Sequence, residues 1–131
     1  MARVRRLRDD GIIRQIGPIF DTKSLGYASS LVAMKVAPEE RVDECGTLIA
    51  SFSAVSHCYR RPSYPDWPYS IFSMVHGRSR EECESVLDAI SKETGLTEYI
   101  ALYSSREHKK VRIRYDDPAF EEWEARFGTP A

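Results

Sequence analysis

The order of strand-like and helix-like segments after Gly26 limits this chain to very few folds. Four segments are rich in apolar and β-branched residues, as strands are; they are residues 27–36, 54–61, 69–76 and 97–104. Apolar residues at helical spacing fill the stretch after the first of these segments and the stretch after the third. The order β-α-β-β-α-β predicts a ferredoxin-like α+β fold, an antiparallel sheet with two helices on one face.

The ends of the two helices are also marked in the sequence. Pro38 suits the first turn of the first helix, and Ser79 with Glu82 three residues later forms a capping box for the second. Gly95 is typical of a helix C-terminus. The apolar positions of the two helices are Val42, Cys45, Leu48, Ile49, Phe52, Cys83, Val86, Leu87 and Ile90.

Two further elements are expected after this unit. Residues 111–115 are predicted to form an additional strand, and a terminal helix carries Phe120, Trp123 and Phe127, with Trp123 docked in the core. The two crossover helices cover only one face of the sheet. A partner subunit is the usual cover for the other face, because an exposed apolar sheet face is otherwise a liability.

The N-terminal segment has a different character. Residues 1–9 are predicted to form a helix that stops at Gly11, and residues 12–20 a β-ribbon. This order is typical of the end of a winged helix-turn-helix followed by its wing. We therefore divide the chain into a truncated winged-helix remnant, residues 1–25, and a ferredoxin-like domain, residues 26–131. DNA binding is not expected, because a recognition helix needs its supporting helix to dock in a groove.

Charge and cysteine content argue against several classes of protein. The 131 residues carry 19 Lys and Arg against 20 Asp and Glu, so overall attraction to nucleic acid or to an anionic membrane is not indicated. No apolar run approaches the roughly 20 residues that span a bilayer, and a soluble, cytoplasmic protein is expected. Three cysteines at spacings unlike a CxxC pair disfavour a disulfide framework and a zinc site.

The segment from His57 to Trp67 concentrates groups that a purely structural strand does not need. Alternation along a strand puts His57, Tyr59 and Arg61 on one face and Cys58 on the other. Guanidinium groups bind carboxylates bidentately, aromatic rings stack on flat ligands, and imidazole or phenol can transfer a proton. The segment therefore predicts a site for a large, flat polyanion.

Motifs over most of the chain resemble the sirohaem (siroheme) decarboxylases, an enzymatic branch of the Lrp/AsnC regulators. The resemblance spans residues 3–116 and includes the runs LRDDGIIRQIGPIFDTKSLGYASSLVAMKV, VSHCYRR, HGRSREECESVLDAISKETG and LYSSREHKKVRIRYD. It implies an Lrp/AsnC effector-type domain that dimerises through its sheet, as a homodimer or with a paralogous subunit. It also implies removal of CO2 from two acetate side chains of sirohaem, giving didecarboxysirohaem for haem or d-type haem biosynthesis.

The family's central motif can be carried onto this sequence residue by residue. Its His, Tyr and Arg fall at His57, Tyr59 and Arg61, and its downstream aromatics fall at Tyr64 and Trp67. The chain departs from the motif at three positions, which are Cys58 and Pro65 in place of asparagines and Pro68 within a Trp-Phe pair. Both prolines remove a backbone hydrogen-bond donor from the loop.

The resemblance implies roles for these side chains. His57 is the candidate general acid, since an ordinary pKa of about 6.5 lets it exchange protons at neutral pH. His57 could instead be an axial ligand of the sirohaem iron, which would leave the acid role to Tyr59, and the sequence does not decide between the two. Arg61 is expected to bind substrate carboxylates, with Arg14 and Lys110 as weaker candidates.

Other expectations concern the loop, the cofactor and the remaining histidines. Tyr64 and Trp67 would cover the macrocycle, or else anchor the loop on the domain. No protein-bound metal and no cofactor is expected beyond the iron-containing tetrapyrrole substrate. His76 and His108 are expected at the surface or at strand ends.

The alternative function is that of an Lrp/AsnC-type transcriptional regulator, or of a haem- or effector-sensing module without catalysis. A third possibility is the less active subunit of a heterodimer.

Overall fold

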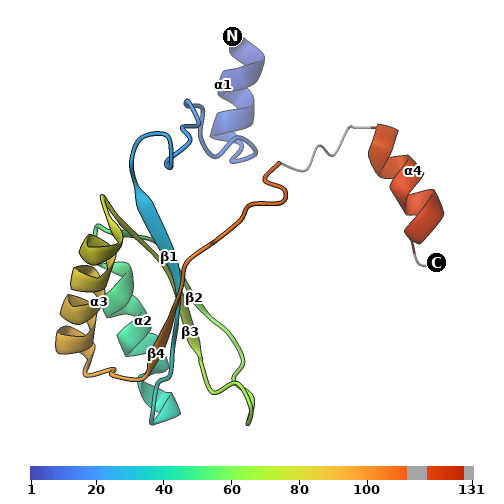
Figure 1. Cartoon of the computed structure of the whole chain (residues 1–131). Coiled ribbons are helices and arrows are strands. Elements are labelled where there is room, and N and C mark those ends of the chain that lie inside the picture. Colours follow the sequence, from blue (N-terminus) through green and yellow to red (C-terminus); the bar gives the residue numbers. More distant parts are fainter. Residues whose placement is uncertain (112–117, 129–131) are drawn as a thin grey trace.

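A four-stranded antiparallel sheet forms the centre of the structure, a computed structural model that describes residues 1–111 and 118–128. The strands are β1 (Ala28–Met34), β2 (Val55–Arg60), β3 (Ile71–Gly77) and β4 (Tyr99–Leu102). Their order across the sheet is β2-β3-β1-β4 (Figure 1). This order, with helices in the two crossovers, confirms the ferredoxin-like α+β fold.

Two helices, α2 (Val42–Ala50) and α3 (Arg80–Thr94), cover one face of the sheet (Figure 1). A short 3-10 turn, Glu39–Arg41, follows Pro38 and leads into α2. Between the helices and the sheet lies a core of almost fully buried side chains; it includes Val32, Met34, Val42, Cys45, Ile49, Ile71, Val75, Cys83, Leu87 and Ile90. Most of the predicted helix positions are therefore confirmed as core, whereas Leu48, Phe52 and Val86 are only partly buried.

The caps of α3 form as the sequence predicts. The Ser79 hydroxyl accepts a hydrogen bond from the backbone N–H of Glu82 at 3.2 Å. Gly95 ends the helix with φ of 72°, a left-handed conformation that glycine adopts at little cost. These caps fix where α3 begins and ends against the sheet.

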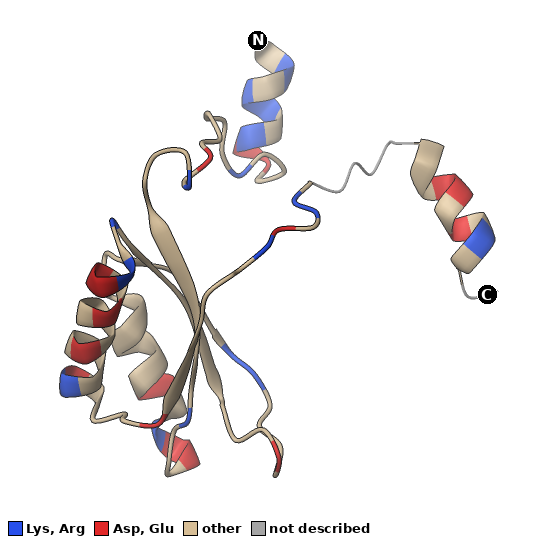
Figure 2. Ribbon diagram, in the orientation of Figure 1, with Lys and Arg blue, Asp and Glu red and all other residues tan. Residues whose placement is uncertain are grey.

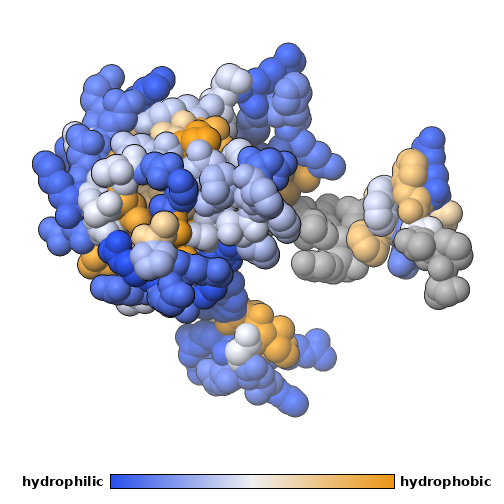
Figure 3. Space-filling view, turned by 90° about the horizontal axis from the view of Figure 1, so that it is seen from below, coloured by the Kyte–Doolittle hydropathy of each residue, from blue (hydrophilic) through white to orange (hydrophobic). Residues whose placement is uncertain are grey.

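The sheet face that points away from α2 and α3, called the open face below, carries no helix. By register and strand alternation it presents Leu31, Tyr59, Met74 and Leu102. Leu31 is 39% exposed and Leu102 is 44% exposed. Figure 3, which views the molecule from below, also shows apolar residues at the surface.

The N-terminal segment contains a helix but no wing. Helix α1 (Ala2–Asp9) ends just before Gly11, whose φ is 73°, as predicted. Residues 12–20 form no strand, so the predicted β-ribbon is wrong. Ile12 and Phe20 stay exposed, and an isolated two-stranded ribbon without a packed face is marginal in water. Helix α1 itself packs against no other helix or strand of the described residues.

The last helix, α4 (Pro118–Phe127), is present as predicted but does not reach the core. It contacts no other helix or strand of the described residues and stands apart from the sheet (Figure 1). Trp123 is 53% exposed, and its ring neighbours are Phe120 and Phe127 of the same helix. The prediction of Trp123 as a core residue is therefore wrong, because aromatic spacing marks an apolar helix face without saying what covers it.

The remaining predictions about the chain have mixed outcomes. The strand expected at residues 111–115 falls, except for Val111, outside the described residues. Cys45 and Cys83 are buried free thiols, as expected. None of the helices described is long and apolar enough to cross a bilayer.

Candidate functional site

Strand β2 divides its side chains between the two faces of the sheet. His57 and Tyr59 lie together on the open face, with 6.1 Å between their ring centroids. Cys58 points toward α2, where its sulfur lies 3.6 Å from the carbonyl oxygen of Gly46. Burial raises the pKa of the Cys58 thiol, so the thiolate needed for nucleophilic attack is disfavoured there. The predicted alternation is confirmed.

Two consecutive arginines at the end of β2 have different partners. Arg60 donates hydrogen bonds to Asp43 at 3.0 and 3.1 Å and to Glu39 at 3.2 Å, on the helix side. Arg61 has no ion pair with the described residues, and its guanidinium carbon lies 5.0 Å from the centre of the Phe72 ring. Arg61 is therefore available to an anionic ligand, whereas Arg60 is engaged within the fold.

A β-bulge in β2 brings a second histidine to His57. The pairing of β2 with β3 shifts register between Val55 and His57, which leaves Ser56 as an extra residue. The Ser56 hydroxyl oxygen lies 2.8 Å from Nδ1 of His57 and 2.6 Å from Nε2 of His76. Burial lowers the pKa of His76, and the nearby charge of His57 lowers it further.

Sequence reasoning missed His76 as part of this group. It was expected at a surface or strand end and does lie at the end of β3, but it is also partly buried and hydrogen-bonded beside the candidate site. One signal was available, because Phe72, Met74 and His76 alternate along β3 and share the open face. The bulge that puts the Ser56 hydroxyl within reach has no marker in the sequence.

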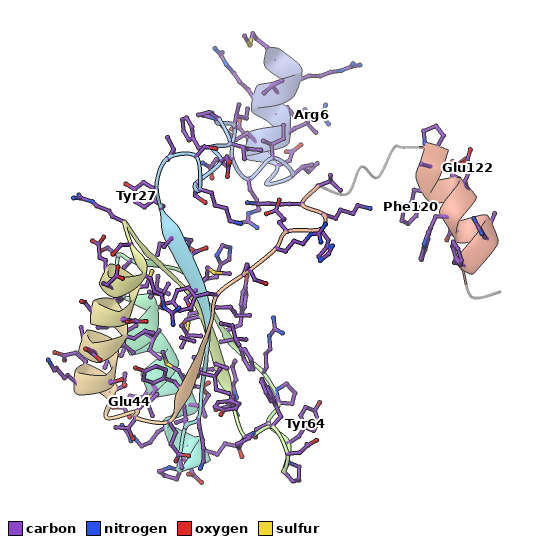
Figure 4. The ribbon with its side chains drawn as sticks, viewed as in Figure 1. Arg6, Tyr27, Glu44, Tyr64, Phe120 and Glu122 are labelled. Carbon is purple, nitrogen blue, oxygen red and sulfur yellow. The ribbon has the colours of Figure 1, made fainter. Side chains whose placement is uncertain are left out.

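The aromatic loop after β2 forms a tight hairpin. Tyr64 and Trp67 exchange two backbone hydrogen bonds of 2.9 Å across the turn, so Pro65 does not interrupt a required donor. The indole of Trp67 packs edge-on against Tyr69, with 4.9 Å between centroids. Tyr64 lies at the end of the sheet opposite Tyr27 (Figure 4). Neither loop aromatic has a ring contact with His57 or Tyr59, so the structure does not bring them together.

A cavity of about 680 Å³ borders the open face at its other end. The sheet contributes Ala28, Ser29 and Met74 to its wall. Ser29 pairs across the strands with His76, and Met74 pairs with His57. The charged residues that line the cavity are mostly basic: Lys23, Arg106, Lys109 and Lys110, with Glu107 as the acid. The ribbon in Figure 2 has basic positions along the segment that follows β4. Lys110 lies in this lining, 3.9 Å from the Glu107 carboxylate.

Arg14 is not part of this arrangement. It lines a separate cavity of about 800 Å³ whose wall consists of residues between Ile12 and Thr22 and includes no strand of the sheet. The predicted wing, which would have carried Arg14, is missing, because residues 12–20 form no strand.

The chemistry of the site rests on proton donors and cations. His57, Tyr59 and His76 can donate or accept protons, and Arg61 and Lys110 can bind carboxylates. Within residues 1–111 and 118–128, no three His, Cys, Asp or Glu side chains lie close enough together to hold a metal ion. The arrangement suits acid–base chemistry on a bound anion.

Comparison with known proteins identifies relatives of the same architecture. The family described as AsnC-like ligand binding domain matches residues 24–109. The siroheme decarboxylase beta subunit of Methanosarcina barkeri is 38% identical over 112 residues, which cover 86% of this chain and 74% of that subunit. The siroheme decarboxylase of Hydrogenobacter thermophilus is 36% identical over 123 residues, 94% of this chain but only 37% of that longer protein.

A solved structure also matches most of this chain. The siroheme decarboxylase NirDL in complex with an iron-uroporphyrin III analogue matches 95% of this chain and 38% of its own, with a TM-score of 0.67 and 35% sequence identity. The chain thus spans little more than a third of the NirDL chain and about three quarters of the Methanosarcina subunit.

Proposed function

This chain belongs to the siroheme decarboxylase family of AsnC-like proteins, and from that premise we propose that it is a subunit of a sirohaem decarboxylase. The reaction removes CO2 from two acetate side chains of sirohaem and leaves methyl groups. Each loss of CO2 leaves an electron pair on a carbon attached to the macrocycle, and a proton must then arrive. The protein's tasks are to hold the other carboxylates and to deliver that proton.

The observation that carries the proposal is the position of His57, Tyr59 and Arg61 on the open face of the sheet. These side chains occupy the one face that the fold leaves without helices, so a large, flat ligand can approach them. The basic cavity continues from this group through Met74 and Ser29. It supplies cations that can bind the peripheral carboxylates of a macrocycle.

The carboxylate clamp is assigned to Arg61 at one end of the group and to Lys110 at the other. Arg61 has a guanidinium free of ion pairs with the described residues, and Lys110 stands among further basic residues of the cavity. A guanidinium binds a carboxylate through two parallel hydrogen bonds, whereas an ammonium acts as a point charge. Arg14 is withdrawn from this set, because its cavity does not border the sheet.

His57 is assigned the general-acid role. Its Nδ1 is held by Ser56, and its Nε2 has no hydrogen bond to the described residues, so Nε2 is the nitrogen that faces a ligand. The same geometry also suits an axial ligand, because a metal-binding imidazole commonly has its other nitrogen hydrogen-bonded. Absorption and electron paramagnetic resonance spectra of sirohaem bound to the wild type and to His57→Gln separate these roles. A lost axial nitrogen signal would assign His57 to the iron and the acid role to Tyr59.

The open face is also assigned to subunit contact. Leu31 and Leu102 expose apolar area there, and the named relatives include subunits called alpha, beta, NirL and NirH. A second copy or a paralogous subunit would bury this area and close the site from water. Tyr64 and Trp67 then face the ligand or the partner from the end of the sheet.

The decisive experiment is anaerobic incubation of the purified chain with sirohaem, alone and with its paired subunit, followed by mass spectrometry. The expected products are the mono- and didecarboxylated tetrapyrroles, and absence of both in each condition would refute the proposal. Arg61→Gln should raise KM for sirohaem at least about tenfold, since charged hydrogen bonds contribute roughly 1.5–3 kcal/mol and about 1.4 kcal/mol is tenfold. Arg60→Gln is the matched control, because Arg60 is paired with Asp43 on the helix side.

A ligand-sensing module without catalysis is the second candidate, favoured by the match of residues 24–109 to the AsnC-like ligand binding domain. A ligand that binds only the folded chain raises its melting temperature. If amino acids raise the melting temperature and sirohaem neither does so nor is converted, the sensing function is correct.

A further inference from the structure

We propose that Ser56 and His76 form a proton relay with His57, through which His76 replaces the proton that His57 gives to the substrate. The inference rests on the proposed decarboxylation and extends it to two residues with no assigned role. Ser56 and His76 act through His57 and are positioning residues in that sense. The observation that supports the relay is the position of the Ser56 hydroxyl group between the two imidazole rings.

The Ser56 hydroxyl bridges the two imidazoles. Its oxygen is 2.8 Å from Nδ1 of His57 and 2.6 Å from Nε2 of His76, both within hydrogen-bond range. A hydroxyl has one proton to donate and lone pairs to accept. It can therefore donate to one ring and accept from the other. In that arrangement the two facing ring nitrogens are complementary, because one carries a proton and the other does not.

One of the two directions that this bridge allows delivers a proton to the substrate. In the donating state, the N–H at Nε2 of His76 donates to Ser56, the Ser56 O–H donates to Nδ1 of His57, and Nε2 of His57 carries a proton toward the substrate. When the C–C bond to the carboxylate breaks, CO2 leaves and its electron pair stays on the methylene carbon. That pair takes the proton from Nε2 of His57. Nδ1 of His57 then takes the Ser56 proton, and Ser56 takes the proton of His76.

The step balances without a redox partner. One acetate side chain and one proton become one methyl group and one CO2, and the proton is drawn from His76. Because two acetates react, the site must be reprotonated between the two events. As its Nε2 proton leaves, His76 takes a proton from solvent at Nδ1, which has no hydrogen bond to the described residues, so the ring stays neutral. Proton exchange with solvent must then restore the first tautomers before the second acetate reacts.

The surroundings of His76 favour a single shared charge. Burial and the charge of His57 both lower the pKa of His76, so the pair resists carrying two positive charges. Tyr59 lies beside His57 on β2, and Ser29 lies opposite His76 on β1. The titratable and charged groups of the adjoining cavity are Lys23, Tyr27, Tyr103, Arg106, Glu107, His108, Lys109 and Lys110. Their excess of positive charge also disfavours a doubly protonated pair.

Kinetics of the complete enzyme, with its paired subunit where one is required, test the relay with four variants. Ser56→Ala removes the bridge, and Ser56→Thr keeps a hydroxyl. His76→Gln keeps a group that can hydrogen-bond to Ser56 but cannot ionise. Ser53→Ala is the matched control, because Ser53 is exposed, lies three residues earlier and makes no side-chain hydrogen bond among the described residues.

Ser56→Ala and His76→Gln are expected to lower kcat at least about tenfold. This is a part of the roughly 10²–10⁴-fold rate enhancement that a positioned general acid contributes. The KM should change less than about twofold. The basic limb of the kcat profile against pH should shift in both variants. Ser56→Thr should recover most of the rate, and Ser53→Ala should match the wild type. If Ser56→Ala or His76→Gln keeps the wild-type kcat and pH profile, the relay is wrong.

Nitrogen NMR of the imidazole side chains gives a readout that does not depend on turnover. In the wild type, the rings of His57 and His76 should show complementary tautomers and a two-step, coupled titration. Ser56→Ala should make the tautomers independent. Independent titration in the wild type overturns the relay even if the enzyme is active. Coupled titration in a protein that never decarboxylates sirohaem overturns the proposed function and the relay's role in it, while the bridged pair itself stands.

Discussion

The two faces of the central sheet differ in what their side chains do. On the helix-covered face, Val32, Met34, Ile71 and Val75 are at most 1% exposed and pack against α2 and α3. On the open face, His57 and Tyr59 are exposed and Ser56 and His76 are joined by hydrogen bonds rather than by packing. The covered face holds the domain together, and the open face carries the candidate chemistry.

This separation has a physical basis in the pleat of a strand. Adjacent residues of β2 belong to different faces, so Cys58 and Arg60 serve the fold while His57, Tyr59 and Arg61 are left to a ligand. A substitution on the open face should therefore change activity with little loss of stability. A substitution on the covered face should do the reverse.

The largest effect is expected for His57→Gln. Removing a positioned general acid should lower kcat for sirohaem decarboxylation by about 10²–10⁴-fold. The melting temperature should stay close to that of the wild type, because His57 is exposed. Single-turnover assays and thermal denaturation measure the two quantities. A large drop in melting temperature with unchanged kcat would place His57 among the structural residues instead.

The opposite pattern is expected for Leu87→Ala in α3. Leu87 is 1% exposed in the core, and truncation of a buried leucine costs about 2–5 kcal/mol of unfolding free energy. Urea denaturation measures this loss, and the folded fraction should keep its kcat. Leu102→Ala on the open face is the control, since Leu102 is 44% exposed and should lose less. Equal losses at both positions would show that the open face is packed as tightly as the covered one.

An intermediate effect is expected for Leu31→Arg at the centre of the open face. A buried, unpaired charge at a subunit contact is costly, so subunit dissociation should rise by at least about tenfold, or roughly 1.4 kcal/mol. Sedimentation velocity over a range of concentrations measures it. Asp88→Arg on the outer surface of α3 introduces the same side chain away from the open face and should leave association unchanged. An unchanged dissociation constant for Leu31→Arg would assign subunit contact to another surface.

Most of the covered face could be predicted from the sequence. Helical spacing located Val42, Cys45 and Ile49, and local rules located the caps at Ser79 and Gly95. These features depend on interactions within a few residues or on an apolar period that any core must satisfy. For the same reason alternation along β2 separated His57 from Cys58.

The errors lie where structure depends on contacts between distant segments. Residues 12–20 have the composition of a ribbon but pair with no strand of the described residues. Trp123 has the spacing of a core residue but, in the same part of the chain, its helix contacts no other helix or strand. His76 joined the site only through the bulge at Ser56, which shifts the register by one residue. Nothing in local sequence specifies that shift, because it depends on how β2 meets β3.

The smallest effect concerns the pH dependence of stability. Folding lowers the pKa of His76 below its ordinary value of 6.5, so the unfolded chain binds this proton more tightly. The contribution of His76 is therefore fully present above about pH 6.5 and is lost as the pH falls through the lower, folded-state pKa. His76→Gln should flatten the dependence of the melting temperature on pH between about 7.5 and 5. His108→Gln is the matched control, because His108 makes no hydrogen bond to the other described residues. If the melting temperature of His76→Gln depends on pH as that of the wild type does, the environment of His76 on the open face does not differ from solvent. The contrast between the two faces would then rest on His57 alone.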